Sequence, residues 1–193
     1  MGGEVKLTTK LIQSDPKSYT IWSYRQWLII SLFKINKEVI KKEKELIQML
    51  LTKDEKNFHV WNYRNWLNSI QSFIDEEINF TTEKIKSNPF NFSPYHFRTK
   101  FIHQKYSELI KTEISEDERK EIVTFGMPKN IFLAEIDIVT KAIFMRPNEE
   151  APWSYYNWLL GQLVPAFVVA REKREGSEEL LTNMKVSNFS ELV

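Results

Sequence analysis

The feature of this chain that most constrains its fold is an aromatic motif that occurs four times. The first copy reads Trp-Ser-Tyr-Arg-Gln-Trp-Leu from Trp22, and the other copies begin at Trp61, Tyr95 and Trp153. Successive copies begin 39, 34 and 58 residues apart. A repeat in the mid-thirties without Gly-rich or strand-like punctuation is typical of stacked helical hairpins. The sequence therefore predicts an all-α repeat protein.

The segments that carry the motif differ from the segments between them. Residues 19–33 are apolar on almost every side of a helix, which is typical of a helix packed between neighbours. Residues 39–51 alternate charged and apolar positions, so we expect an outer helix with one wet face. An outer helix, a short polar turn and an inner aromatic helix follow one another in each repeat. This order predicts an α/α superhelix, a right-handed solenoid of helical hairpins with a concave face for a partner.

Two stretches break the repeat. Residues 107–129 contain a charged cluster and end in Gly-Met-Pro, so we expect an insertion there in the third repeat. We expect a helical-repeat domain over residues 1–165, followed by a C-terminal helix and tail over residues 166–193, where the chain becomes polar. Residues 4–13 are expected to form an outer helix without a preceding partner, as if the chain began partway through a solenoid.

Composition excludes several classes of function. The formal net charge of +1 gives no general attraction to nucleic acid or to anionic membranes. The chain has no cysteine, and therefore no disulfide, thiolate metal site or cysteine nucleophile. No apolar run approaches the ~20 residues that span a bilayer, so a cytoplasmic protein is expected. His96 and His103 would share a helix face, but no third ligand accompanies them, so we expect no metal or other cofactor on this chain.

Arginines and tryptophans recur at fixed places in the motif and are expected to serve the repeat itself. An arginine three residues after the leading aromatic residue shares its helix face and can reach a carboxylate, a helix C-terminus or an aromatic ring. These arginines are Arg25, Arg64 and Arg98. The flat indoles are expected to fill the core, with Tyr95 at the equivalent place in the third repeat. The tryptophans are Trp22, Trp27, Trp61, Trp66, Trp153 and Trp158. By themselves, these residues indicate an interaction protein without a self-sufficient active site.

The turns that precede the motif are more specific than the motif. Residues 15–22 read Asp-Pro-Lys-Ser-Tyr-Thr-Ile-Trp, and residues 57–61 read Asn-Phe-His-Val-Trp. Both resemble the Pro-Lys-Asn/Ser-Tyr-x-x-Trp-x-x-Arg repeat of protein prenyltransferase α-subunits. The Phe of the second turn and the segments 88–98 and 127–161 are most similar to the type II branch, the Rab geranylgeranyltransferases. The resemblance covers about residues 5–161.

This resemblance implies a heterodimeric enzyme. The α-subunits of the family are crescents of helical hairpins around a β-subunit barrel, which holds Zn²⁺ and most of the isoprenoid pocket. The type II enzyme transfers a geranylgeranyl group from its diphosphate to C-terminal cysteines of Rab GTPases, which an escort protein presents. We therefore expect an α-subunit that needs its β-subunit for activity, meets geranylgeranyl diphosphate at the subunit interface and carries no cofactor itself.

The resemblance also implies which residues take part in the reaction. Lys17 is the lysine of the Pro-Lys-x-Tyr turn, and it would stabilise the charge that develops on the diphosphate as the allylic C–O bond breaks. Tyr19 lines the same site in the family, so both are candidate catalytic residues. Asn57, Phe58 and His59 match positions at the subunit interface near the diphosphate. We expect these three to bind substrate or the partner subunit.

Three alternatives stay open at this point. The chain could be the α-subunit of a farnesyltransferase or geranylgeranyltransferase-I, although Thr20 stands where those α-subunits have a Gln that helps bind the substrate carboxylate. It could be a non-catalytic helical-repeat scaffold that binds a peptide or a helix in its groove. An RNA-processing repeat protein is the third alternative, and a net charge of +1 does not support it.

Overall fold

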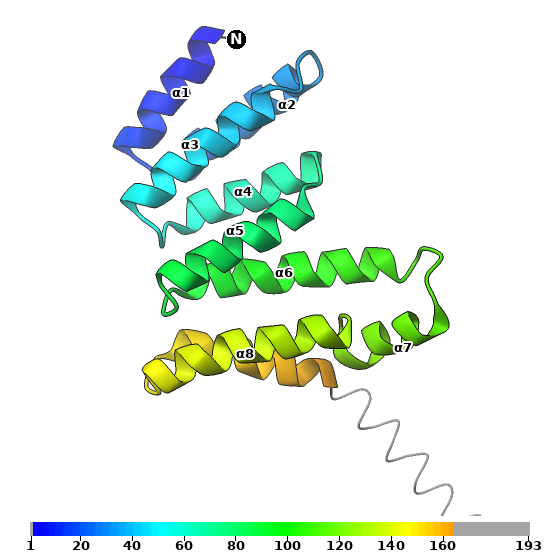
Figure 1. Ribbon diagram of the computed structural model, residues 1–193. Helices are drawn as coiled ribbons and strands as arrows, with labels where there is room; N and C mark the ends of the chain where they lie inside the picture. Colours follow the sequence, from blue (N-terminus) through cyan, green and yellow to red (C-terminus); the bar gives the residue numbers. More distant parts are fainter. Residues whose placement is uncertain (1, 164–193) are drawn as a thin grey trace, which may run out of the picture. The chain divides into compact units, whose positions relative to one another are not determined.

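The computed structural model describes residues 2–163, which form helices joined by short turns (Figure 1). The helices with defined ends are α1 (Gly2–Ser14), α2 (Tyr19–Phe33), α3 (Val39–Lys53), α4 (Phe58–Ile70), α5 (Ile74–Ser87), α6 (Phe92–Leu109), α7 (Glu116–Phe125) and α8 (Lys129–Met145). Residues 150–163 are also helical. The described part of the chain contains no strand, so the predicted all-α repeat class is confirmed. None of its helices is long and apolar enough to cross a bilayer.

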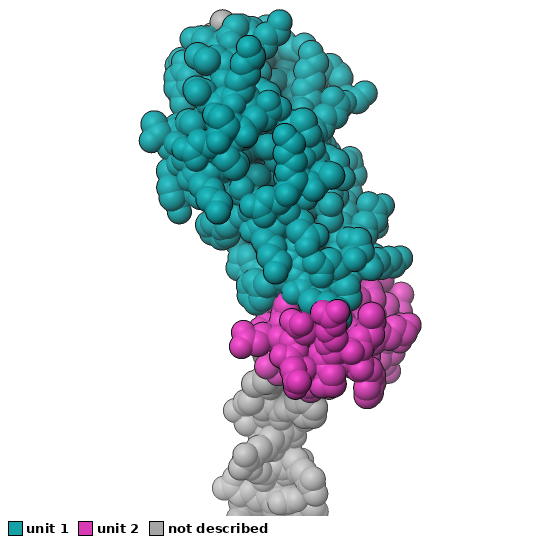
Figure 2. Space-filling view, turned by 90° about the vertical axis from the view of Figure 1, so that its left-hand side faces the viewer, with its two compact units in different colours: residues 1–102 teal, residues 103–193 magenta. Residues whose placement is uncertain are grey.

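The chain forms two compact units, residues 1–102 and residues 103–193 (Figure 2). In the first unit, α2 packs against α1, α3 and α4, and α3 packs against α4. In the second unit, α7 packs against α8 and lies within the stretch where the sequence predicts an insertion. The predicted C-terminal helix and tail over residues 166–193 lies outside the described residues. The predicted domain over residues 1–165 stays a prediction.

Aromatic side chains of successive motif helices pack against each other in the first unit. Trp22 and Trp61 are buried, and each contacts the next repeat: Trp22 meets Tyr63 at 4.8 Å between ring centroids. Trp61 stacks on Phe97 at 5.4 Å. The leading aromatic residue of one repeat therefore fills the space against the following repeat, as the flat shape of indole allows.

The prediction that all six tryptophans are buried is wrong. Trp27 is 58% exposed and Trp153 is 41% exposed, while Trp66 and Trp158 are half-buried. Trp27 lies five residues after the leading tryptophan of its repeat, which turns it to a different side of the helix. Trp153 has no following repeat among the described residues to cover it. The apolar surface of α2 is therefore only partly core.

The motif arginines are buried in polar clusters that join neighbouring helices. The guanidinium of Arg25 donates from Nε and Nη2 to the two carboxylate oxygens of Glu43, both at 2.7 Å. The hydroxyl of Tyr63 donates to the same carboxylate at 2.8 Å. Although burial disfavours the charged form, the hydrogen bonds to Glu43 raise the pKa of Arg25 above its ordinary value. The ion pair thus joins α2 to α3, and the Tyr63 hydrogen bond adds α4 to the cluster.

A hydrogen bond between a glutamate on an outer helix and a tyrosine 20 residues later recurs along the chain. The pairs are Glu4 with Tyr24, Glu43 with Tyr63 and Glu135 with Tyr155, at 3.3, 2.8 and 2.8 Å from hydroxyl to carboxylate oxygen. In the third repeat, Phe97 stands 20 residues after Glu77. Oε1 of Glu77 is buried and has no hydrogen-bond partner in the structure. Burial raises the pKa of Glu77, although the nearby Arg64 lowers it.

Phe97→Tyr is expected to raise the free energy of unfolding by about 1–2 kcal/mol, because the new hydroxyl would donate to the Glu77 carboxylate as Tyr63 does to Glu43. This bond favours the ionised carboxylate and lowers the pKa of Glu77. The added stability is therefore present at a pH where Glu77 is ionised, and it is lost as the pH falls through the pKa of Glu77. Urea unfolding at several pH values measures it. Tyr63→Phe is the reverse control and is expected to lose a similar amount. A destabilised Phe97→Tyr variant would contradict the assignment.

Candidate functional site

Lys17 lies exposed in the turn between α1 and α2, and two contacts fix the backbone of this turn. The backbone N–H of Lys17 donates to Oδ1 of Asp15 at 3.3 Å, which makes an Asx turn. The indole N–H of Trp22 donates to the carbonyl oxygen of Pro16 at 2.9 Å. The side chain of Asp15 and the indole of Trp22, at the start of α2, therefore hold this turn. The backbone that carries the Lys17 ammonium is therefore preorganised.

The same arrangement holds the corresponding turn in the other repeats. The leading aromatic side chain donates to the carbonyl six residues before it: Trp61 to Glu55 at 2.9 Å, Tyr95 to Pro89 at 3.1 Å and Trp153 to Pro147 at 2.7 Å. The Asx turn also recurs before α4, where the N–H of Lys56 donates to Asp54 at 3.1 Å. Lys56 is therefore the equivalent of Lys17 one repeat later. The leading aromatic residue serves the turn as well as the core, which sequence analysis did not predict.

The structure brings three of the predicted site residues together. The ring of Tyr19 meets that of His59 edge to face at 4.4 Å between centroids, and His59 contacts the ring of Phe58 at 6.2 Å. Asn57 is buried and caps α4 by accepting from the N–H groups of His59 and Val60. Asn57 therefore positions its two neighbours. In the described part of the chain, the Lys17 ammonium has no hydrogen bond or cation–π contact with these rings.

Exposed aromatic residues occupy the same position in three consecutive repeats. Tyr19, Phe58 and Phe92 are the first residues of α2, α4 and α6, and each is more than half exposed. We call these three residues the aromatic row. Large aromatic side chains left in solvent at equivalent places are typical of a surface that a partner covers. The aromatic row begins two residues after Lys17, so an apolar surface adjoins a cation.

The histidines do not form a metal site within the described residues. No group of three His, Asp or Glu side chains between residues 2 and 163 lies close enough together to hold a metal ion. His96 instead stacks on Phe92 at 5.9 Å between ring centroids. Burial and the nearby Lys100 lower the pKa of His96, which favours its neutral form near pH 7. The expectation that this chain carries no cofactor stays a prediction.

Comparison with known families accounts for the repeated turn and helix. The family model described as "Protein prenyltransferase alpha subunit repeat" matches residues 2–32, 40–70 and 74–105. These matches coincide with the pairs α1–α2, α3–α4 and α5–α6. The chain belongs to the protein prenyltransferase α-subunit repeat family. In terms of that family, Lys17 and Lys56 lie in the turns that join the two helices of the first and second repeats.

Curated relatives of this prenyltransferase α-repeat chain are named geranylgeranyl transferase type-2 subunit alpha. The protein from Rattus norvegicus is 31% identical over 163 residues, which are 84% of this chain and 26% of the relative. The Schizosaccharomyces pombe protein is 26% identical, covering 84% of this chain and 35% of the relative. The Candida albicans protein is 30% identical, covering 77% and 45%. The chain thus spans less than half of each relative, and the predicted likeness to the type II branch is confirmed.

Proposed function

We propose that this chain acts as the α-subunit of a heterodimeric protein geranylgeranyltransferase of the Rab type. In the proposed enzyme, a β-subunit holds Zn²⁺ and most of the isoprenoid pocket. The complex transfers a geranylgeranyl group from its diphosphate to C-terminal cysteines of Rab GTPases, which an escort protein presents. The prenyltransferase α-subunit repeats and the names of the relatives support this proposal.

The observation that carries the proposal is the aromatic row beside the Lys17 turn. Geranylgeranyl diphosphate has a long apolar chain and an anionic head, so its site needs an apolar surface that adjoins a cation. Tyr19 and Phe58 offer exposed rings, and Lys17 offers an exposed ammonium two residues from Tyr19. The β-subunit would cover the row, because exposed aromatic surface of this kind is favourable to bury.

The proposed role of Lys17 is electrostatic. When the allylic C–O bond breaks, negative charge accumulates on the departing diphosphate oxygen. An ammonium held beside that oxygen stabilises the charge more in the transition state than in the ground state, which raises the rate. The Asx turn to Asp15 and the Trp22 hydrogen bond keep the backbone of the turn in place, so little reorganisation is needed at that step.

Co-expression with the prenyltransferase β-subunit from the same source tests the proposal. We expect a stable one-to-one complex on gel filtration, because burial of the aromatic row stabilises it. Phe58→Ser is expected to weaken the complex about tenfold or more, since it removes an exposed ring from the centre of the row. Leu7→Ser, an exposed apolar residue of the outer helix α1, is the control and is expected to leave affinity unchanged.

The reaction of the complex distinguishes the alternatives. Geranylgeranylation of a Rab GTPase in the presence of its escort protein would support the proposed function. Prenylation of a short peptide that ends in a CaaX sequence would instead identify a farnesyltransferase or geranylgeranyltransferase-I subunit. If no complex forms with the β-subunit, the scaffold alternative replaces the enzyme.

A further inference from the structure

In the first and third repeats, the preceding outer helix supplies hydrogen-bond acceptors to the Nη1 atom of the motif arginine. In both repeats, this atom donates to two threonine hydroxyls and one backbone carbonyl. For Arg25 the acceptors are Thr8 at 2.9 Å, Thr9 at 3.0 Å and the Val5 carbonyl at 3.2 Å. For Arg98 they are Thr81 at 2.9 Å, Thr82 at 2.8 Å and the Ile78 carbonyl at 2.7 Å. The chain itself supplies three neutral acceptors to each arginine.

The second repeat lacks these acceptors. Ile47 and Gln48 stand 17 and 16 residues before Arg64, at the two positions that threonines occupy in the other repeats. Arg64 donates from Nε to Glu77 at 2.6 Å, and no acceptor among residues 2–163 bonds to its two Nη atoms. The residue is only 6% exposed. The two Nη atoms are not among the buried unpartnered atoms of the described residues, so they are open to the pocket, where a ligand oxygen can take the place of water.

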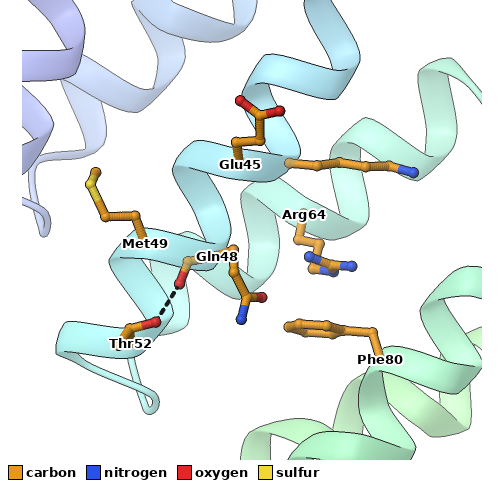
Figure 3. A pocket seen from close by; sticks show the side chains of 7 residues that line it. Glu45, Gln48, Met49, Thr52, Arg64 and Phe80 are labelled. Atoms are coloured by element: carbon orange, nitrogen blue, oxygen red, sulfur yellow. Dashed lines mark hydrogen bonds between the residues drawn. The ribbon is translucent and has the colours of Figure 1, made fainter.

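A pocket of about 520 Å³ opens where the threonines are missing, between α3, α4 and α5. Figure 3 shows the guanidinium of Arg64 and the ring of Phe80 facing each other in this pocket, with Gln48 beside them. The guanidinium carbon lies 3.5 Å from the centroid of the Phe80 ring. Met49 adds further apolar lining. The pocket is open to solvent, and its lining combines the apolar groups of Phe80 and Met49 with polar side chains, which are Lys44, Glu45, Gln48 and Thr52.

The charges around the pocket favour a neutral ligand. Arg64 is paired with Glu77, and Lys44 at the pocket wall is paired with Glu76 at 2.6 Å. Glu45 also lines the pocket. Because both cations already have a carboxylate and a third carboxylate is near, an anionic ligand would meet repulsion. A neutral carbonyl or hydroxyl oxygen would not, and such groups are what the Nη1 atoms of Arg25 and Arg98 bind.

We propose that this pocket binds a neutral ligand that carries an amide carbonyl beside a hydroxyl group, the combination that a threonine or serine residue presents. The carbonyl and hydroxyl oxygens would accept from the Nη atoms of Arg64. The aliphatic part of the ligand would lie against Phe80 and Met49. The site is separate from the aromatic row and does not depend on the proposed enzyme activity.

The test uses N-acetylthreonine N-methylamide as the probe in a ¹⁵N NMR titration of the full chain. We expect saturable shift changes in the residues of α3, α4 and α5 that line the pocket. Gln48→Thr places a hydroxyl at the position of Thr9 and Thr82, where it would accept from Arg64 and close the site. It is expected to weaken probe binding about tenfold, the effect of one hydrogen bond to a charged group.

Gln48→Val is the matched control, because it has the shape of threonine without the hydroxyl and should keep the affinity of the parent chain. Gln48→Thr should also raise Tm by about 5 °C relative to Gln48→Val, which reports the new bond in the absence of ligand. Shift changes that do not cluster at the pocket, or equal affinity of the two variants, would overturn the proposal. A second titration with a ten-residue threonine-containing peptide shows whether the ligand is part of a polypeptide or a small molecule. Tighter binding of the peptide than of the probe indicates a polypeptide ligand, and equal binding indicates a small molecule.

Discussion

Glu43→Ala is expected to lower the free energy of unfolding by about 3–5 kcal/mol, the usual effect of breaking a buried ion pair from one side. The carboxylate of Glu43 accepts two hydrogen bonds from Arg25 and one from Tyr63, and both ends of the ion pair are almost fully buried. Its removal leaves a charged guanidinium without a counter-charge in the core. Typical domains have only about 5–15 kcal/mol of stability, so the loss is a large fraction of the total. Urea unfolding followed by circular dichroism measures it.

Glu45→Ala is the control for this change, because Glu45 lies on the same helix and is exposed. A surface substitution of this kind is expected to change stability by no more than about 0.5 kcal/mol. If Glu43→Ala fails to fold, Tyr63→Phe removes a single hydrogen bond from the same carboxylate and keeps the cluster measurable. Equal stability of the Glu43 and Glu45 variants would show that the cluster does not stabilise the fold.

The repeat, the helical class and the order of outer and inner helices could be predicted from the sequence. The period of the aromatic motif indicates stacked hairpins, and Asn57 marks the start of α4 as a helix-capping residue does. The sequence could not separate the buried aromatic residues from the exposed ones. Trp27 and Trp22 belong to the same apolar pattern, yet only Trp22 is buried. A helix that is apolar all round is expected to be buried, whether its own chain or another one covers it.

The glutamate of each polar cluster cannot be identified from composition. Glu43 lies in an outer helix among many other charged residues, and its composition does not distinguish it from Glu45. The signal that identifies it is its register, 20 residues before the tyrosine of the following motif. The same register gives Glu135 with Tyr155 and shows that Phe97 breaks the pattern. Spacing between different residue types in different helices is therefore informative once the repeat is known.

Only the family resemblance indicates the candidate site, because Lys17 on its own has the features of an ordinary exposed lysine. The structure adds a physical reason for its position in the Asx turn to Asp15 and the Trp22 hydrogen bond to Pro16. It also brings Tyr19 and His59 into contact across two repeats. These side chains are 40 residues apart in the sequence, and only the stacking of hairpins brings them together.

Lys17→Ala is expected to slow geranylgeranyl transfer by about 10- to 1,000-fold in the complex with the β-subunit, by analogy with the loss of one oxyanion donor. This prediction rests on the proposed function. The ammonium would act mainly on charge that develops in the transition state, so kcat should fall more than the affinity for the diphosphate. Single-turnover transfer of a radiolabelled geranylgeranyl group to a Rab GTPase measures the chemical step, and gel filtration checks that the complex is intact.

Two further variants determine whether Lys17 acts through its charge and through its position in the turn before α2. Lys17→Arg keeps a cation in the same turn and should recover part of the rate, whereas a role in shaping the turn alone would give no such recovery. Lys56→Ala removes the equivalent lysine one repeat later, which the same Asx turn holds. It should leave the rate within about threefold of the parent, because Lys56 lies in the turn of the second repeat and the proposed role belongs to the turn of the first. If Lys17→Ala and Lys56→Ala transfer the prenyl group equally fast, Lys17 has no special part in the reaction, and its turn serves only to begin α2.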